Sequence, residues 1–546
     1  MRRWNGWGNN QVEYPLPPEG AEFIEAAVGT GTAPADATLA SSLAALPISR
    51  APDGAGLRQD PLERLLHARG QSLPDWVALR AGRIGAFPDA VAYPADTEEV
   101  AHLIRFAGER QLHLIPFGGG TSVVGHINPQ PSEAPIVTVD LGHLQRLQSL
   151  DEISLLATFE AGVRGPDLES ALRARGFTLG HFPQSFEFST LGGWVATRSS
   201  GQQSLHYGRI EGLFAGGHVE TPAGAMDFTP VPASGAGPDL RHLMLGSEGR
   251  LGILTTAVVR VRRVPEEETF SAAFFPSWEA GLEALRAMAQ QRVPLSMLRL
   301  SNSLETETTL ALAGRPGLVA WGDRGLRLLG YAHGRCLLLL AATGDARRVR
   351  SARAQAYALV RRFGGLPAGT PIGSMWRKTR FLAPYLRNTL WERGYALDTL
   401  ETAVPWSAVP TAAEAILGAL RQGLELEQER VLAFLHVSHV YPDGASLYAT
   451  FLFRHSPDPD ETLERWRRLK AAATRQVLAQ GGTLSHQHGV GLDHAPYLTE
   501  EKGEVGMRAL QVALAAFDPL GIMNPGKLLE SPQPSAVSRQ PPRGDS

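Results

Sequence analysis

The stretch His113-Leu-Ile-Pro-Phe-Gly-Gly-Gly-Thr-Ser122 decides the fold of this chain, because it joins a strand pattern directly to a glycine loop. Upstream, Val91–Tyr93 predicts a short strand, and apolar side chains at helical spacing from Val100 to Ala107 predict a helix. A strand, a helix, a second strand and a glycine loop in this order are typical of a βαβ-like unit. The three glycines allow backbone N–H groups to approach a phosphate, and the two hydroxyl side chains that follow add donors.

The loop matches neither of the common nucleotide-binding motifs. Val123 stands where a dinucleotide-binding G-x-G-x-x-G begun at Gly118 needs its third glycine, and no lysine follows as in a P-loop. A Gly-Gly-Gly turn alone is more often a plain loop than a cofactor site. Two more glycine-rich blocks, Phe188–Gly201 and Ser247–Leu254, change this balance. Three such loops in one chain favour a large phosphate-bearing ligand that touches all of them.

The composition is that of an ordinary globular protein. The chain has 546 residues, of which 43% are hydrophobic and 20% charged, with a net charge of −3. These values exclude a disordered or fibrous protein and argue against a nucleic-acid-binding protein. Only four of the 52 Lys and Arg residues are lysines. This bias indicates a GC-rich genome or a need for bidentate anion binding.

The single cysteine, Cys336, excludes an intramolecular disulfide framework and lies in an apolar run that predicts a buried core position. The first residues carry positive charges, but the apolar stretch of a signal peptide does not follow them. No run approaches the ~18 apolar residues that a membrane span requires. We therefore expect a cytoplasmic protein without an integral membrane segment.

Changes of pattern along the chain predict its domain organisation. We expect an N-terminal helical or irregular extension at residues 1–89 and a domain holding the glycine loops at 90–265. Pro265 and the acidic residues after it mark a boundary, and a second domain of mixed helices and strands follows at 266–505. A segment at 506–530 returns to the first domain, and the Pro-, Ser- and Arg-rich residues 531–546 predict a disordered tail.

The glycine motifs together resemble the FAD-binding, p-cresol-methylhydroxylase-type flavoprotein superfamily, which includes vanillyl-alcohol-oxidase-type enzymes. The matching elements are Pro-x-Gly-Gly-Gly-Thr-Ser at 116–122, Thr-x-Gly-Gly-x-x-x-Thr-Arg-x-Ser-Gly at 190–201, Gly-Ser-Glu-Gly-x-Leu-Gly at 246–252 and Asp-Pro-Leu-Gly-Ile-Met-Asn-Pro-Gly-Lys at 518–527. The resemblance implies an α+β fold, in which a two-subdomain FAD-binding domain carries an α+β cap domain with an antiparallel sheet.

The resemblance also implies FAD as the cofactor, with its pyrophosphate under the first loop. The residues expected to contact FAD are Pro116, Phe117, Gly118, Gly119, Gly120, Thr121, Ser122, His181, Gln184, Ser185, Ser189, Thr190, Gly192, Gly193, Thr197, Arg198, Ser199, Ser200, Glu248, Gly249, Leu251, Gly252 and Ile253. Relatives that attach FAD covalently often carry a histidine after the glycine pair of the first loop. Because Gly120 and Thr121 stand there, we expect non-covalent FAD.

Two branches of the superfamily compete. The FAD-dependent D-2-hydroxy-acid dehydrogenases carry a metal site of histidines and a carboxylate. Here Tyr448 replaces the second histidine of the element that begins at His439, and Gln487 replaces the glutamate of the later one, so we expect no metal. The other branch, alkyldihydroxyacetone-phosphate synthase, exchanges an acyl group for a fatty alkoxy group and uses the flavin as a scaffold rather than for net redox chemistry.

The cap motifs are similar to those of the synthase branch. Its His-rich motif resembles Ser485-His-Gln-His-Gly-Val-Gly491, with glutamine in place of the middle histidine, and its catalytic tyrosine matches Tyr448. Arg3–Gly8, Tyr385–Arg387, Leu298–Leu300 and Leu400–Ala403 also resemble this branch. The resemblance implies Tyr448, His486 and His488 as catalytic residues and Arg387 and Arg299 as substrate-binding residues. A purely structural role stays open for each, and His439, Arg454 and Trp406 are interpreted as structural.

The expected function is the exchange of the acyl group of an acyl ketose phosphate for a fatty alcohol, a step of ether-lipid formation. The alternative is a FAD-dependent dehydrogenase or oxidase of a D-2-hydroxy acid or related alcohol. The expected partners are a small-molecule or lipid substrate and no nucleic acid, and a homodimer is left open as the assembly.

Overall fold

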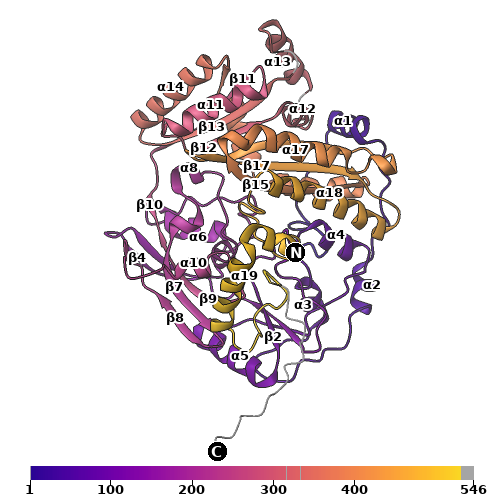
Figure 1. Ribbon diagram of the computed structural model, residues 1–546, viewed down its shortest axis with the longest axis vertical. Coiled ribbons are helices and arrows are strands. Elements are labelled where there is room, and N and C mark those ends of the chain that lie inside the picture. The colour runs from indigo at the N-terminus through magenta and orange to yellow at the C-terminus, as the bar shows by residue number, and fades with distance from the viewer. Residues whose placement is uncertain (1, 315, 332–333, 530–546) are drawn as a thin grey trace, which may run out of the picture.

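The computed structural model describes residues 2–314, 316–331 and 334–529, and Figure 1 shows its two halves. The lower half holds the glycine loops, and the upper half is built around the largest sheet. The α+β fold with a two-part FAD-binding domain and an antiparallel cap is confirmed. The predicted tail at 531–546 lies outside the described residues.

The first part of the lower half is a parallel sheet of three strands. Its order is β1 (Ala90–Ala92), β3 (Ile136–Asp140) and β2 (His113–Phe117). Helix α5 (Thr97–Arg110) connects β1 to β2, and its buried side chains are Val100, Leu103, Ile104 and Ala107. The predicted βαβ-like unit and its apolar helix face are therefore confirmed. Asp96 begins the helix by accepting a hydrogen bond from the Glu99 amide at 2.9 Å.

The second part is an antiparallel sheet of five strands. In spatial order these are β4 (Leu147–Asp151), β5 (Leu156–Glu160), β9 (Ile253–Arg260), β7 (Phe214–Thr221) and β8 (Gly224–Phe228). Two short strands, β6 (Phe177–Thr178) and β10 (Arg262–Arg263), pair separately. The helices of this part are α6 (Gly165–Arg173), α7 (Leu191–Thr197), α8 (Ser204–Tyr207), α9 (Ile210–Leu213) and α10 (Arg241–Met244).

The cap is one antiparallel sheet of seven strands. In spatial order these are β14 (Leu366–Gly369), β11 (Glu267–Phe275), β13 (Cys336–Gly344), β12 (Met297–Ser301), β16 (Leu432–Val440), β17 (Gly444–Arg454) and β15 (Tyr395–Pro405). One face packs against α11 (Trp278–Gln290), α14 (Ala346–Arg362), α17 (Val409–Gln422) and α18 (Pro459–Ala479). The remaining cap helices are α12 (Ser303–Ala311), α13 (Pro316–Leu328), α15 (Pro371–Thr379) and α16 (Ala383–Glu392).

Strand β13 shows why this sheet can separate two cores. Its side chains alternate, so that Leu338 and Leu340 belong to one core while Leu337 and Leu339 belong to the other. Cys336 is fully buried at the start of this strand, as predicted, and burial raises the pKa of its thiol to about 12.

The chain ends tie the two halves together. The N-terminal residues form α1 (Pro18–Val28), α2 (Leu39–Ala44), α3 (Pro61–Leu66) and α4 (Leu73–Arg80), and α1 packs into a core of cap residues. Helix α19 (Leu498–Phe517) is kinked at Gly503 and spans the predicted boundary at 505/506. It leads back to the parallel sheet, where the Leu114 amide donates to Ile522 O at 2.8 Å.

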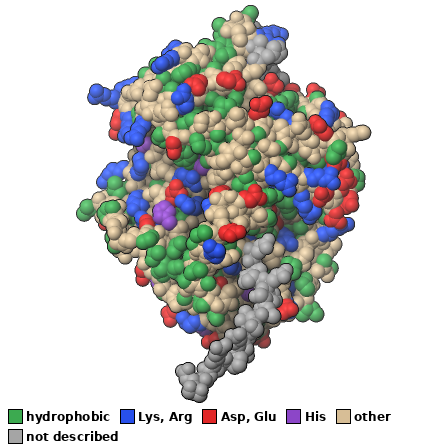
Figure 2. Space-filling view, viewed as in Figure 1, with side chains coloured by type: hydrophobic (Ala, Val, Ile, Leu, Met, Phe, Trp, Pro, Cys, Tyr) green, Lys and Arg blue, Asp and Glu red, His purple; other side chains and the backbone are tan. Residues whose placement is uncertain are grey.

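Hydrophobic side chains gather around α19 on the face seen in Figure 2. Val505, Val512 and Leu520 are 70%, 71% and 60% exposed. Among the described residues, no helix is long and apolar enough to cross a membrane.

Candidate functional site

The first glycine loop follows β2 and packs directly on the second glycine block. A Cβ atom at Gly119 would lie 1.9 Å from the carbonyl oxygen of Phe188, so no larger residue fits there without moving backbone. Thr190 begins α7 by accepting a hydrogen bond from the Gly193 amide at 3.3 Å. The two loops therefore meet backbone to backbone, and glycines of both line the same cavity.

The third loop connects this surface to the cap. The Glu248 carboxylate accepts hydrogen bonds from the amides of Val490 at 2.5 Å and Gly491 at 2.9 Å. Asn524 Nδ2 donates to the Glu248 carbonyl at 2.6 Å, so the C-terminal motif also closes on this loop. The side-chain atom Asn524 Oδ1 is buried beside the cavity without a hydrogen-bond partner among the described residues, and His126 Nε2 lies 3.2 Å from Glu248 Oε1.

A cavity of about 550 Å³ lies between the three loops and the cap sheet. Its volume is in the range of cofactor and ligand sites. The glycine-lined wall and the unpartnered Asn524 side-chain oxygen fit a large group with phosphates and ring heteroatoms, and therefore fit FAD. All but four of the site residues expected from the sequence line this cavity; the exceptions are His181, Arg198, Leu251 and His486.

The four exceptions have other contacts. His181 donates to or accepts from Ser199 Oγ at 2.7 Å behind the cavity wall, and burial lowers its pKa to about 3. Arg198 ends α7 in the left-handed conformation and pairs with Glu211 at 2.7 Å. Leu251 packs in a core with the C-terminal segment. The ring of His486 packs against that of His439, which does line the cavity, with centroids 4.9 Å apart.

Tyr448 lies on β17 between two histidines. Its ring stacks on that of His436 with centroids 5.0 Å apart, and it meets the ring of His488 edge-on at 5.6 Å. Burial raises the pKa of Tyr448 to about 12, so the phenol keeps its proton at neutral pH. Tyr448 can therefore donate a hydrogen bond or a proton to a group in the cavity.

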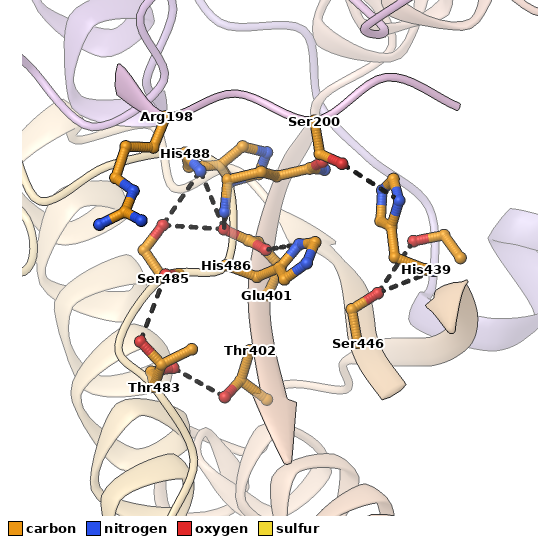
Figure 3. A network of polar contacts seen from close by, with 12 residues as sticks. Arg198, Ser200, Glu401, Thr402, His439, Ser446, Thr483, Ser485, His486 and His488 are labelled. Atoms are coloured by element: carbon orange, nitrogen blue, oxygen red, sulfur yellow. Dashed lines mark hydrogen bonds and ion pairs between the residues drawn. The ribbon is translucent and has the colours of Figure 1, made fainter. Parts of the chain in front are cut away.

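The loop that carries His486 and His488 is held by Glu401 of β15, as Figure 3 shows. Glu401 Oε1 accepts hydrogen bonds from Ser485 Oγ at 2.8 Å and from the amides of Gln487 at 2.8 Å and His488 at 2.9 Å. Glu401 also lies directly opposite Tyr448 in the pairing of β15 with β17. One buried carboxylate therefore fixes the loop relative to the tyrosine.

Both histidines of this loop are held neutral. Burial lowers the pKa of His486 well below its usual range, with His439 and Arg209 acting in the same direction. Its Nε2 lies 2.6 Å from Tyr441 Oη. Burial also lowers the pKa of His488, and the nearby Glu401 carboxylate partly opposes this. A neutral imidazole can accept a proton, so His488, which lines the cavity, can act as a base there.

The two predicted substrate arginines differ in their contacts. Arg299 Nη2 pairs with Glu305 Oε1 at 2.8 Å, and His436 Nδ1 lies 2.9 Å from the same oxygen. Burial acts to raise the pKa of Glu305, but His436 and Arg299 outweigh it and lower that pKa to about 2. The positive charge of Arg299 is therefore balanced by a carboxylate of the protein itself.

Arg387 of α16, in contrast, has guanidinium nitrogens that pair with no described residue. Its Nη1 donates to Gln71 O and its guanidinium carbon lies 4.4 Å from the centre of the Trp76 ring. The Nε and Nη2 atoms are buried without hydrogen-bond partners among the described residues. Burial lowers the pKa of Arg387 to about 10, so it stays charged at neutral pH. A buried unpaired cation is unfavourable, which favours an anionic ligand here.

The cavity lining also includes an apolar part, contributed by strands of the cap sheet, by α1 and α16 and by the end of α12. Its residues are Ile24, Leu312, Leu390, Leu397, Leu432, Phe434 and Leu452. Leu452 lies four residues from Tyr448 on β17, and Leu390 lies three residues from Arg387 on α16, so this apolar part adjoins the polar one.

Several cavity residues carried no clear signal in the sequence. His439, interpreted as structural, lines the cavity, and its ring centroid lies 4.9 Å from that of His486. Trp7, His126 and Glu305 also line it and were not predicted to do so.

The interpretation of Arg454 as structural agrees with its ion pair to Glu429 at 2.9 Å. Within the described ranges, no group of three or more His, Cys, Asp or Glu side chains is placed to hold a metal ion.

Comparisons with known proteins give matches to both halves of the chain. Residues 88–227 match the family model "FAD binding domain", and residues 264–528 match "FAD linked oxidases, C-terminal domain". The chain is 31% identical over 480 residues to alkyldihydroxyacetonephosphate synthase of Dictyostelium discoideum, which covers 87% of this chain and 78% of that protein. It is also 31% identical over 485 residues to the alkyldihydroxyacetonephosphate synthase of Trypanosoma brucei brucei, a match that covers 87% of this chain and 79% of that protein.

A solved structure of an alkyldihydroxyacetonephosphate synthase superposes with a TM-score of 0.83 at 26% identity, over 96% of this chain and 98% of that one. The likeness thus extends over the FAD-binding part, the cap and the connecting segments. This chain belongs to the alkyldihydroxyacetonephosphate synthase family of FAD-linked flavoproteins.

Proposed function

We propose that this enzyme binds FAD and exchanges the acyl group of an acyl ketose phosphate for a fatty alcohol, forming an ether bond. The observation that carries this proposal is the apolar part of the cavity lining, which adjoins Tyr448 and Arg387. A fatty chain can contact these apolar side chains, whereas a small 2-hydroxy acid leaves them without a ligand. Membership of the synthase family supports the same reaction.

The roles of the chain's own residues follow from their protonation states. The bond from the ketose carbon to the acyl oxygen breaks, and a bond from that carbon to the alcohol oxygen forms. The uncharged imidazole of His488 takes a proton from this carbon and returns it after the exchange, and the neutral phenol of Tyr448 passes the proton of the alcohol to the departing carboxylate. Arg387 binds the departing carboxylate or the phosphate through its free guanidinium atoms. Bound FAD serves as the scaffold for this exchange and undergoes no net oxidation or reduction.

The other predicted site residues complete the proposal. Arg299, through Glu305, holds His436 against the Tyr448 ring and so positions the tyrosine. His486 supports the loop from behind the cavity. The cofactor contacts predicted from the three glycine loops, with non-covalent FAD, remain part of this proposal.

Anaerobic incubation of the purified holoenzyme with palmitoyl-dihydroxyacetone phosphate and hexadecanol tests the function. We expect an ether product and free palmitate while the visible flavin band stays unchanged. Absence of the ether, together with bleaching of that band by a D-2-hydroxy acid, would establish the dehydrogenase instead.

We further propose a homodimer in the cytoplasm. The single, buried Cys336 supports a reducing compartment, and the exposed apolar side chains of α19 leave a surface available for association. Light scattering on the purified protein should give twice the chain mass of 58.8 kDa. A mass of one chain would contradict the dimer.

A further inference from the structure

The N-terminal segment Arg3–Gly8 has no role in the function as described so far. Its second tryptophan, Trp7, is only 6% exposed and lines the cavity. The indole ring packs edge-on against Phe188, with ring centroids 5.7 Å apart. The segment therefore reaches from the chain terminus to the second glycine block and forms part of the cavity wall.

Helix α16 holds Trp7 in this position. The Asn388 side chain accepts a hydrogen bond from the Trp7 amide and donates one to the Trp7 carbonyl, each at 3.1 Å. The next residue, Gly8, has a φ of +79°, and a Cβ there would lie 2.2 Å from the Tyr385 ring. The same helix carries Arg387, so it fixes both Trp7 and the arginine.

Gln71 joins Trp7 to Arg387 from a third direction. Its Nε2 donates to the Gly6 carbonyl at 3.4 Å, directly before Trp7, and its own carbonyl accepts from Arg387 Nη1. Gln71 also lines the cavity. Gln71 thus connects Arg387 to the backbone immediately before Trp7.

The polar atoms of this pair are all donors. Trp7 Nε1 and Arg387 Nε and Nη2 are buried, and none of them has a hydrogen-bond partner among the described residues. Indole and guanidinium groups carry N–H donors and no acceptors. A buried donor without a partner is unfavourable, and a positive charge adds to this. The pair therefore lacks an acceptor with negative charge.

We propose that Trp7 is a substrate-binding residue whose indole N–H binds an oxyanion of the substrate together with Arg387. The oxyanion is the phosphate of the ketose or the carboxylate of the acid that departs. The identity of the substrate rests on the proposed function; the donor pair itself rests on the contacts above.

The substitution Trp7→Phe tests this, because it keeps an aromatic ring against Phe188 and removes the N–H. Calorimetric titration of the holoenzyme with dihydroxyacetone phosphate and, separately, with palmitate should show a dissociation constant about tenfold higher for one of them. The probe that responds identifies a phosphate or a carboxylate as the bound group. FAD content and thermal unfolding should stay those of the wild type.

Trp4→Phe is the matched control. It makes the same exchange three residues away, in a side chain that packs against a separate core and is not among the described residues that line the cavity. It should bind both probes as the wild type does.

Equal affinity of Trp7→Phe and wild type for both probes would overturn the proposal, as would loss of FAD, which would place the indole at the cofactor. If Trp7→Phe does not yield folded holoenzyme, Asn388→Ala tests the same contact by releasing the Trp7 backbone; wild-type affinity for both probes in that variant would also overturn it. Failure of the proposed function is distinguishable, because no ether would form although Trp7→Phe still weakened oxyanion binding.

Discussion

Glu401 gives the sharpest test of how the cap builds its site. Its Oε1 atom accepts three hydrogen bonds from the loop that carries His488, two of them from backbone amides. Glu401→Ala leaves the Gln487 amide without an acceptor, at about 1–3 kcal/mol, whereas the His488 amide keeps its hydrogen bond to Ser485 Oγ at 3.0 Å. The loop would relieve this cost by moving, so we expect kcat to fall on the order of a hundredfold, as displacements of about 1 Å do.

Glu401→Gln separates the charge from the hydrogen bonds. The amide oxygen can still accept from the loop, so kcat should stay close to the wild-type value. The lost negative charge lies 3.9 Å from His488 Nδ1 and normally raises the pKa of that ring. Its removal should lower the pKa further, and the acid limb of the kcat/KM profile should move to lower pH.

Steady-state kinetics across a pH series measure both effects. Glu429→Gln is the control, since Glu429 is a partly buried cap carboxylate paired with Arg454 and Arg465. It should lower thermal stability without moving the pH profile. If Glu401→Ala kept the wild-type kcat, or if Glu401→Gln behaved like the control, the assignment of Glu401 as the positioning residue would be wrong.

Four more outcomes are expected. Gly119→Val should give a colourless apoprotein by visible absorption, because its Cβ would lie 1.9 Å from a carbonyl oxygen. Tyr448→Phe should lower kcat by roughly 10²–10⁴-fold with FAD retained, as measured by ether formation. Arg387→Met should raise KM on the order of a hundredfold and leave kcat within about tenfold of wild type. Burial lowers the pKa of His181 and of His439 from 6.5 to about 3, so the unfolded chain binds more protons below pH 6.5. The free energy of unfolding should therefore fall as the pH drops from about 6.5 towards 3, by up to about 1.4 kcal/mol per pH unit for each histidine, as thermal melts will show.

The cofactor half could be predicted from the sequence because its requirements are local. A backbone that touches a ligand or a second loop needs glycine, and Gly119 lies against Phe188 with no room for a side chain. The helix after β1 was equally visible, since one face of Val100 to Ala107 is buried at helical spacing. Such features depend on neighbours in the sequence and leave a pattern there.

The cap site could be predicted only in part, because its partners are far apart in the chain. Glu401 and Ser485 are separated by 84 positions, and Asn388 and Trp7 by 381. Nothing in the local pattern of either pair indicates the contact. The place of His439 beside the cavity could not be predicted for the same reason, since its position on β16 gives no sign that His486 packs beside it.

The contacts of three arginines show what the fold reveals that the amino-acid composition does not. All three arginines singled out in the sequence were expected beside anionic groups. Arg198 pairs with Glu211 and Arg299 with Glu305, so the protein itself supplies their anions. Arg387 alone of these three keeps buried donors without partners among the described residues. The sequence could not separate them, because the partner carboxylates lie on other elements.

The fate of the alcohol oxygen tests the central claim most directly. The holoenzyme is incubated anaerobically with palmitoyl-dihydroxyacetone phosphate and hexadecanol labelled with heavy oxygen, and the products are analysed by mass spectrometry. The exchange proposed here places the label in the ether and leaves the released palmitate unlabelled. Label in the palmitate, or no ether at all, would contradict it.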